Sequence, residues 1–169
     1  SGEELELIYE TFESNYIAPT GPMLERMEKE FAQQLGIAKC LAVSSGTAAI
    51  HLALRHLGVT KGDTVLASTL TFIGSVSSVV HQNANVVFVD SDEATWNMDP
   101  NRLKEAIEDL HAKGIRPKAI VPTELYGQCV DLDEIQVVAN QYEIPVVCDS
   151  AESLGATYKG RPSGQGAYA

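Results

Sequence analysis

The stretch Ser44-Ser45-Gly46-Thr47-Ala48-Ala49-Ile50 decides the fold, because it joins one apolar run to an apolar-periodic one. The run at residues 40–43 predicts a strand, and residues 47–57 predict a helix. Such a turn leaves backbone N–H groups unpaired at the first helical turn, where the helix dipole adds partial positive charge. This arrangement is typical of a phosphate site. The alternative is an ordinary capped helix, with Ser45 or Thr47 as its cap.

Composition and charge restrict the class of protein. A length of 169 residues suits one domain and is too short for two ordinary ones. No run approaches the ~20 apolar residues of a membrane span, and the acidic first residues do not form a signal peptide. The formal charge of −11 disfavours non-specific binding to nucleic acid or to an anionic membrane. We therefore expect no nucleic-acid partner and no membrane association.

The cysteines indicate the compartment. Cys40, Cys129 and Cys148 are odd in number, widely spaced and form no CxxC pair. This pattern is typical of reduced thiols in a cytoplasm, and it argues against a disulfide framework or a zinc site. We therefore expect a cytoplasmic protein with no bound metal.

Short apolar strands alternate with periodic helices along the chain. Expected strands, besides residues 40–43, lie at residues 64–67, 86–89, 119–122 and 146–148. Expected helices lie at residues 3–14, 22–35, 47–57 and 72–82, from Asp99-Pro100 and from Asp131. Strands of this kind are typical of a sheet that is covered on both faces. The alternation predicts a three-layer α/β/α fold with a mainly parallel sheet and right-handed crossovers.

The first two predicted helices are amphipathic. The first carries an apolar stripe of Leu5, Ile8, Tyr9 and Phe12. The second is expected to bury Leu24, Met27, Phe31 and Leu35. Pro22 suits its first turn and Gly36 its C-terminal cap.

Parallel sheets bind ligands at the carboxyl ends of their strands, so the residues that follow each strand should meet. These residues are 44–47, 68–72, 90, 123–128 and 149–153. They are rich in hydroxyl groups and include one aromatic ring and several carboxylates. Neither the dinucleotide fingerprint GxGxxG nor the P-loop pattern is present.

Three side chains at this edge suit a planar ring that carries a hydroxyl group and a protonated nitrogen. Asp149 ends an apolar run, and a carboxylate there can keep a ring nitrogen protonated, as the electron-sink chemistry of pyridoxal phosphate requires. Phe72 can stack on a ring, and Glu152 can accept a hydrogen bond from a ring hydroxyl. The alternatives are structural: a helix cap for Asp149, core packing for Phe72 and a capping-box partner for Glu152.

Six stretches of the chain occur in the order of a known family. They are residues 14–22 (SNYIAPTGP), 45–54 (SGTAAIHLAL), 71–72 (TF), Asp90 with 95–98 (TWNM), 125–128 (LYGQ) and 149–155 (DSAESLG). The chain thereby resembles the DegT/DnrJ/EryC1/StrS family, the pyridoxal-phosphate-dependent nucleotide-sugar aminotransferases of fold type I. Residues 96–98 and 151–155 most resemble the subgroup that aminates C4 of UDP-linked 4-keto-6-deoxy-N-acetyl sugars.

The resemblance implies a role for each matching residue. It implies that Gly46 and Thr47 hold the phosphate of pyridoxal 5′-phosphate and that Phe72 stacks on the ring. It further implies that Asp149 pairs with the ring nitrogen and that Glu152 bonds the ring hydroxyl.

The resemblance also implies substrates and an assembly. These are a nucleotide-sugar substrate, an amino-acid donor expected to be glutamate, a homodimer, and a place in surface-polysaccharide biosynthesis. The loop at residues 17–22 would border the sugar-nucleotide pocket. Two positions depart from the family pattern, because Glu124 stands where many relatives carry His and Ser150 stands where Ala is common.

No catalytic residue is assigned within the chain. The Schiff-base lysine of the family is expected beyond Ala169, after a Gly-rich segment like that at residues 163–166. Lys159 lies in the Tyr-Lys-Gly turn before that segment and is not given the role. We expect residues 1–169 to be the N-terminal part of the cofactor-binding large domain, without the lysine segment or the C-terminal small domain, and to be inactive alone.

Two other functions stay open from the sequence. One is a sugar dehydratase of the same family, in which His replaces the lysine. The other is a non-catalytic regulatory or structural relative that keeps the fold and binds no cofactor. The residue at the lysine position distinguishes the dehydratase from a transaminase. Cofactor absorbance distinguishes a transaminase from the non-catalytic relative.

Overall fold

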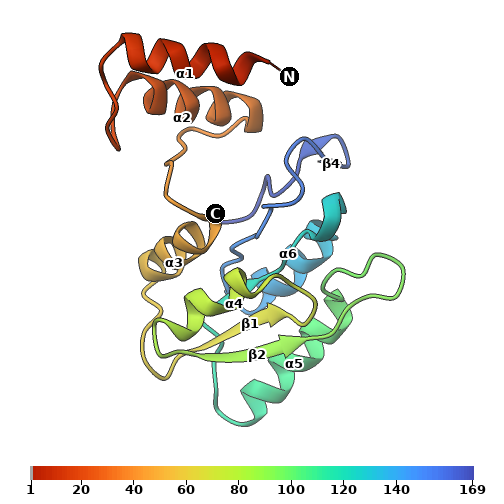
Figure 1. The fold of residues 1–169 in the computed structure, drawn as a ribbon. Helices are drawn as coiled ribbons and strands as arrows, with labels where there is room; N and C mark the ends of the chain where they lie inside the picture. Colours follow the sequence, from red (N-terminus) through yellow and green to blue (C-terminus); the bar gives the residue numbers. More distant parts are fainter. Residues whose placement is uncertain (1) are drawn as a thin grey trace. The chain divides into compact units, whose positions relative to one another are not determined.

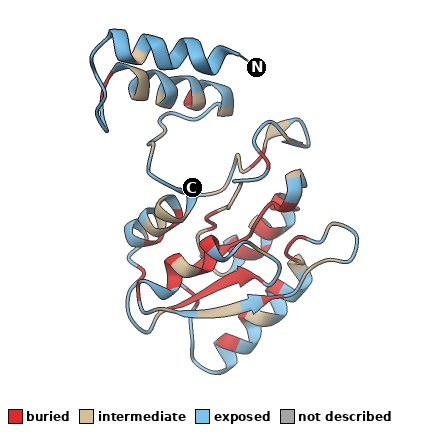
Figure 2. Cartoon of the chain, in the orientation of Figure 1, coloured by how far each residue is buried: buried red, intermediate tan, exposed pale blue. Residues whose placement is uncertain are grey.

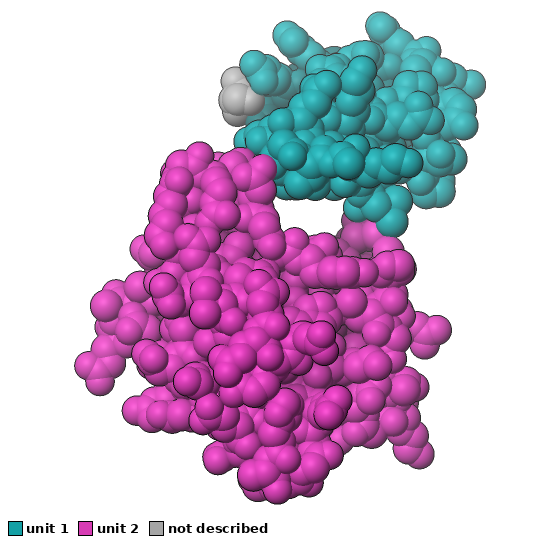
Figure 3. Space-filling view, turned by 180° about the vertical axis from the view of Figure 1, so that it is seen from behind, with its two compact units in different colours: residues 1–42 teal, residues 43–169 magenta. Residues whose placement is uncertain are grey.

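The computed structural model describes residues 2–169, and the chain divides into two compact units, residues 1–42 and 43–169 (Figures 1 and 3). Unit 1 holds α1 (Glu3–Glu13) and α2 (Pro22–Leu35). Unit 2 holds α3 (Gly46–His56), β1 (Thr64–Ser68), α4 (Ile73–Val80), β2 (Asn85–Val89), α5 (Pro100–Ala112), β3 (Ala119–Val121), the 3-10 turn η1 (Leu125–Gly127), α6 (Leu132–Gln141), β4 (Thr157–Tyr158) and β5 (Arg161–Pro162).

Unit 1 is a pair of helices with a small buried face. Pro22 opens α2 and Gly36 ends it in the left-handed conformation, at φ 65°, as predicted. Ala32 is the only buried residue of α2, and Met27, which was expected to be buried, is 52% exposed. None of the residues of α1 is buried, so its apolar stripe is exposed. A helix buries its apolar stripe only by packing against another element. Two short helices offer each other too little surface to bury both stripes.

A parallel sheet in the order β2-β1-β3 forms the centre of unit 2. Residues 146–149 extend it beside β3 through parallel bridges, one between Ile120 and Val146 and one between Thr123 and Asp149. The mainly parallel sheet that the strand–helix alternation predicted is therefore confirmed.

Helices cover both faces of this sheet, and β1 is buried along its whole length (Figure 2). Leu66 of β1 lies opposite Val87 of β2 and Ile120 of β3, and it packs into the core cluster formed with α5 and α6. Val65 and Ala67 point to the other face and pack with α3 and α4. This alternation is the period-2 pattern of a strand. The three layers are thus α3 with α4, the sheet, and α5 with α6, as predicted.

The strand predicted at residues 40–43 is absent. None of the strands in residues 2–169 pairs with it, and an extended segment without a partner cannot form the hydrogen bonds that define a strand. Leu41 is 64% exposed, whereas the predicted strand would have been buried. The helix that follows the turn is nevertheless present.

The hairpin of β4 and β5 was not predicted as a pair of strands, although its Tyr-Lys-Gly turn was recognised. Lys159 has φ 49° and Gly160 has φ 79°. Positive φ values at both central residues are those of a type I′ turn, which matches the twist of two antiparallel strands. Strands of two residues are too short to show an alternating pattern in the sequence.

Candidate cofactor site

The N-terminus of α3 has both a cap and free N–H groups. The Oγ of Ser45 accepts a hydrogen bond from the Ala48 N–H at 3.1 Å, so Ser45 is the cap, as the structural alternative held. In residues 2–169, no acceptor bonds the N–H groups of Gly46 and Thr47. A Cβ at Gly46 would meet nothing within 4 Å. The cap therefore coexists with an open site that offers two N–H donors to an anion.

Thr47 and Phe72 border the same small space beside Gly74. A Cβ on Gly74 would lie 2.7 Å from Thr47 Oγ1 and 3.0 Å from the Phe72 ring. Gly74 is buried in the first turn of α4, so the close approach of α3 and α4 depends on its missing side chain. Phe72 is 69% exposed, so it does not pack into the core of unit 2, and its ring is accessible for stacking.

Asp149 ends a chain of hydrogen-bonded hydroxyl groups. Its Oδ2 accepts a hydrogen bond from Ser75 Oγ, which is bonded to Thr71 Oγ1 at 2.8 Å. Thr71 Oγ1 is bonded in turn to Thr123 Oγ1 at 2.7 Å. The Ala151 N–H donates to Oδ1 at 3.2 Å. These contacts fix the carboxylate at the carboxyl edge of the sheet and bring it no neutralising cation.

Ser75 is the residue of this edge that the sequence reasoning missed. It is 1% exposed and lies in the first turn of α4. A usable signal existed, because Thr71 and Ser75 are four residues apart at the start of a predicted helix. That spacing places two side chains on one face.

Glu152 lies on a turn and not on a helix. Residues 150–155 form turns, so the helix-cap and capping-box alternatives for Asp149 and Glu152 are wrong. Glu152 Oε2 accepts a hydrogen bond from the Tyr126 N–H at 2.6 Å. Tyr126 is 87% exposed and holds a left-handed φ of 51°, a conformation uncommon for a bulky residue. Glu152 is itself exposed, so its carboxylate remains accessible.

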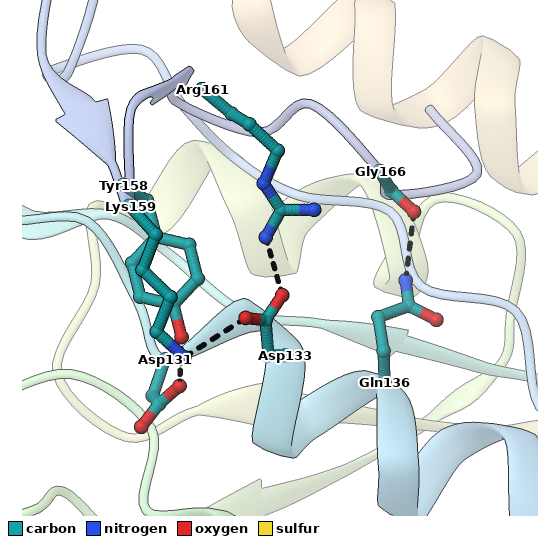
Figure 4. A network of polar contacts seen from close by, with 7 residues as sticks. All are labelled: Asp131, Asp133, Gln136, Tyr158, Lys159, Arg161 and Gly166. Carbon is teal, nitrogen blue, oxygen red and sulfur yellow. Dashed lines mark hydrogen bonds and ion pairs between the residues drawn. The ribbon is translucent and has the colours of Figure 1, made fainter.

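Lys159 is engaged in an ionic network at the start of α6 (Figure 4). Its Nζ lies 2.9 Å from Asp133 Oδ2, and Arg161 bonds the other oxygen of that carboxylate. Hydrogen bonds with Tyr158 and with Asp133 raise the pKa of Lys159. An amine acts as a nucleophile only when it is deprotonated, so these contacts argue against Lys159 as the Schiff-base lysine.

The structure brings most of the predicted site residues to one edge of the sheet. Gly46, Thr47 and Phe72 lie where α3 approaches α4, and Asp149 is joined to α4 through Ser75. Glu152 lies on the turn that follows Asp149, and not on the helical turn that its three-residue spacing from Asp149 predicted. The loop at residues 17–22 belongs to unit 1, and its place beside a sugar-nucleotide pocket stays a prediction.

In residues 2–169, no group of His, Cys, Asp and Glu side chains is placed to hold a metal ion. The helices of the same range are too short or too polar to cross a membrane. All three cysteines are free.

The model of the DegT/DnrJ/EryC1/StrS aminotransferase family matches residues 1–169. This chain belongs to that family. The resemblance seen in the six sequence stretches and the parallel sheet with covered faces are therefore confirmed together.

Individual members of the DegT/DnrJ/EryC1/StrS family are similar over almost the whole chain. EpsN of Bacillus subtilis (strain 168), named as a pyridoxal phosphate-dependent aminotransferase, is 45% identical over 164 residues, which are 97% of this chain and 42% of EpsN. GDP-perosamine synthase of Caulobacter vibrioides is 39% identical over 163 residues, with coverages of 96% and 42%. The chain thus spans about 42% of the length of these curated relatives.

A solved structure agrees with the sequence relatives. Spr1654 of Streptococcus pneumoniae, named as a sugar aminotransferase, matches in its PLP form with a TM-score of 0.87 and 32% identity, over 99% of this chain and 45% of that chain. A PMP form of Spr1654 matches as well. These findings indicate pyridoxal 5′-phosphate as the cofactor.

The residues present fit this cofactor. The N–H groups of Gly46 and Thr47 suit a phosphate, and the missing side chain of Gly74 lets Thr47 and Phe72 approach the same point of α4. The Asp149 carboxylate is oriented and lacks a cationic partner in residues 2–169, so it can pair with a protonated ring nitrogen.

Proposed function

We propose that this chain is part of a pyridoxal-phosphate-dependent aminotransferase that moves an amino group from glutamate to the keto sugar of a nucleotide-sugar. The acceptor is C4 of a UDP-linked 4-keto-6-deoxy-N-acetylhexosamine, and the product serves surface-polysaccharide biosynthesis. Family membership supports the reaction, and the motif versions at residues 96–98 and 151–155 support the acceptor.

The proposal extends to the whole protein. Residues 1–169 form the N-terminal part of the cofactor-binding large domain, and the rest of the protein supplies the Schiff-base lysine and a small domain. The 42% coverage of EpsN supports this placement. The full-length protein is a cytoplasmic homodimer with its active sites near the interface.

The hydroxyl chain that ends on Asp149 is the observation that carries the proposal. Pyridoxal phosphate, when bound, supplies an electron sink at the substrate carbon. Asp149, oriented by Ser75, keeps a proton at the ring nitrogen, which that chemistry requires. Gly46 and Thr47 bind the phosphate with their N–H groups and the dipole of α3.

Two further residues orient the ring. Phe72 covers one face of it, because its own ring is exposed beside Gly74. Glu152 accepts a hydrogen bond from the ring hydroxyl with the carboxylate that also receives the Tyr126 N–H. Together these residues leave the reacting carbon free for the lysine from the rest of the protein.

The test is an assay of the full-length protein with glutamate and a UDP-linked 4-keto-6-deoxy-N-acetylhexosamine. Mass spectrometry should show that an amino group has replaced the C4 oxygen, with 2-oxoglutarate formed in equal amount. A sugar that has lost a hydroxyl group and kept its C4 oxygen would instead show the dehydratase. Absence of cofactor absorbance in the purified protein would show the non-catalytic relative.

A further inference from the structure

Glu124 is a buried carboxylate to which the proposed function gives no role. It is 1% exposed and lies between β3 and η1. In residues 2–169, no Lys, Arg or His forms an ion pair with it, and its Oε1 has no hydrogen-bond partner. Burying a carboxylate without a cation costs free energy, so its position in the core calls for an explanation.

Two hydrogen bonds tie Glu124 to the turn that carries the proposed ring-binding carboxylates. The Glu124 N–H donates to the carbonyl oxygen of Asp149 at 2.9 Å. Glu124 Oε2 accepts a hydrogen bond from Ser153 Oγ at 2.6 Å. Asp149 and Ser153 are the two ends of the turn, and Glu152 lies between them. One residue therefore holds both ends of the turn.

The far end of the turn is buried and depends on side chains. Ser153 is 1% exposed, and its carbonyl oxygen accepts a hydrogen bond from Ser163 Oγ at 2.8 Å. The bond at Asp149 uses the backbone of residue 124 and survives any substitution except proline. The bond at Ser153 uses the carboxylate and is specific to the side chain of Glu124.

The neighbouring thiols do not offer Glu124 another role. Burial, followed by the charge of Glu124, raises the pKa of both Cys129 and Cys148, and a weak contact between the Cys129 thiol and the Glu124 carboxylate adds to the shift at Cys129. Both thiols therefore stay neutral at physiological pH and bring no charge to the site. The carboxylate of Glu124 acts on the turn through Ser153 and not through thiolate chemistry.

We propose that Glu124 is a positioning residue, which clamps residues 149–153 so that Asp149 and Glu152 face the cofactor ring together. This inference rests on the proposed function. Without the clamp, Ser153 Oγ keeps only the Ser150 carbonyl oxygen, at 3.2 Å, as an acceptor. The side-chain tie between residue 124 and the far end of the turn is lost, and Glu152 is held less firmly relative to Asp149.

The test measures binding of pyridoxamine phosphate to the full-length protein by fluorescence titration. This probe binds without a covalent bond, so the titration is independent of the lysine. Glu124→Ala should raise its Kd about 10-fold or more, the loss expected for a hydrogen bond to a charged group. Glu124→Gln keeps an oxygen acceptor for Ser153 and should restore binding to within roughly threefold. Glu105→Gln, the same change on the exposed face of α5, should leave binding unchanged.

A second readout separates positioning from general stability. The absorption spectrum of bound pyridoxamine phosphate, followed against pH, reports the groups around the ring, and Glu124→Ala should shift this titration. A lower melting temperature with an unchanged Kd and an unchanged spectral titration would overturn the inference. Should Glu124→Ala fail to fold, Ser153→Ala removes the same bond and is expected to act in the same direction.

The result for the unsubstituted protein keeps the two proposals apart. If it does not bind pyridoxamine phosphate, the proposed function fails and the inference falls with it. If it binds and neither Glu124→Ala nor Ser153→Ala changes Kd, the clamp alone is refuted.

Discussion

At the scale of single residues, Asp149 is oriented by hydroxyl groups, and none of the cationic side chains in residues 2–169 pairs with it. Ser75 donates to it from α4, and Thr71 and Thr123 extend the chain across the edge of the sheet. A cation beside Asp149 would neutralise the charge that a protonated ring nitrogen requires. Neutral donors fix the carboxylate and leave its charge available to a ligand.

The first prediction separates charge from orientation at Asp149. Asp149→Asn keeps the shape but removes the charge that holds the ring proton, so kcat/KM of the full-length enzyme should fall roughly 100-fold. Ser75→Ala removes only the orienting bond and should cost about 10-fold. Steady-state kinetics with the keto-sugar nucleotide measure both. Equal losses in the two variants would refute the division of roles.

The second prediction concerns the thiols. Burial is the main cause that raises the pKa of Cys148, whose sulfur is enclosed although the residue keeps some exposed area, and burial also raises that of Cys129. Iodoacetamide at pH 8 should therefore label Cys40 before either of them, as peptide mass spectrometry will show.

The raised pKa values of the Cys148 and Cys129 thiols also predict how the free energy of unfolding depends on pH. A thiol pKa that is higher in the folded state adds stability below the ordinary thiol pKa of about 8.5, and this stability is lost as the pH rises above it. The free energy of unfolding should accordingly fall between about pH 8 and pH 10. Labelling of Cys148 as fast as Cys40 in the folded protein would contradict both expectations.

At the scale of elements, the packing of α3 on α4 depends on one glycine. A Cβ at Gly74 would lie 2.7 Å from Thr47 Oγ1, whereas one at Gly46 would meet nothing within 4 Å. The two glycines border the same proposed phosphate site but differ in what surrounds them. They therefore make a matched pair for substitution.

The third prediction uses this pair. Gly74→Ala should lower the free energy of unfolding by roughly 1–3 kcal/mol, because it overpacks the contact between α3 and α4. Gly46→Ala should change it by less than about 0.5 kcal/mol, yet it should weaken binding of pyridoxamine phosphate, since the new methyl group would occupy open space at the proposed phosphate site. Urea unfolding and a fluorescence titration measure the two effects. A Gly46→Ala variant that is less stable but binds pyridoxamine phosphate as well as the unsubstituted protein would contradict this prediction.

Helix signals in the sequence were reliable where they were local. Pro22, Gly36 and Asp99-Pro100 mark helix ends that the structure confirms, because a cap involves only neighbouring residues. The prediction of a strand at residues 40–43 was wrong, because a strand depends on a partner that lies elsewhere in the chain. The bond from Ser75 to Asp149 joins residues 74 positions apart, and no short-range pattern contains it.

The candidate site was predictable only in outline. The rule that ligands bind at the carboxyl ends of parallel strands predicted that Thr47, Phe72 and Asp149 meet. Thr47 and Phe72 lie beside Gly74 of α4 and Asp149 bonds Ser75 of the same helix, although the strand expected before Thr47 is absent. It did not find the clamp of Glu124 on Ser153, since both side chains are buried and their spacing follows no motif. Patterns in the sequence thus located the edge of the sheet, whereas the contacts that orient its side chains required the structure.

At the scale of the whole molecule, an acidic chain has to bind an anionic cofactor. The formal charge is −11, and the first turn of α3 carries no acidic residue. Backbone N–H groups there supply local positive potential without a basic side chain. Residues 1–169 thus combine a negative net charge with one place that suits a small phosphorylated ligand.

The fourth prediction concerns assembly. The stripe of α1 leaves Ile8 51% exposed and Phe12 64% exposed, and apolar surface of this kind favours association. The full-length protein should therefore sediment as a dimer at micromolar concentration. Phe12→Ser, on the stripe, should weaken the dimer, whereas Glu6→Gln in the same helix should not. A stable monomer of the unsubstituted protein would contradict the homodimer.

The most direct test of the central claim is a crystal structure of the full-length protein with pyridoxamine phosphate. We expect the phosphate to accept hydrogen bonds from the Gly46 and Thr47 N–H groups and Phe72 to stack on the ring. An Asp149 oxygen should lie about 2.8 Å from the ring nitrogen, the length of a charge-assisted hydrogen bond. A ligand bound away from the N-terminus of α3, or a ring nitrogen without a contact to Asp149, would contradict the proposed cofactor site.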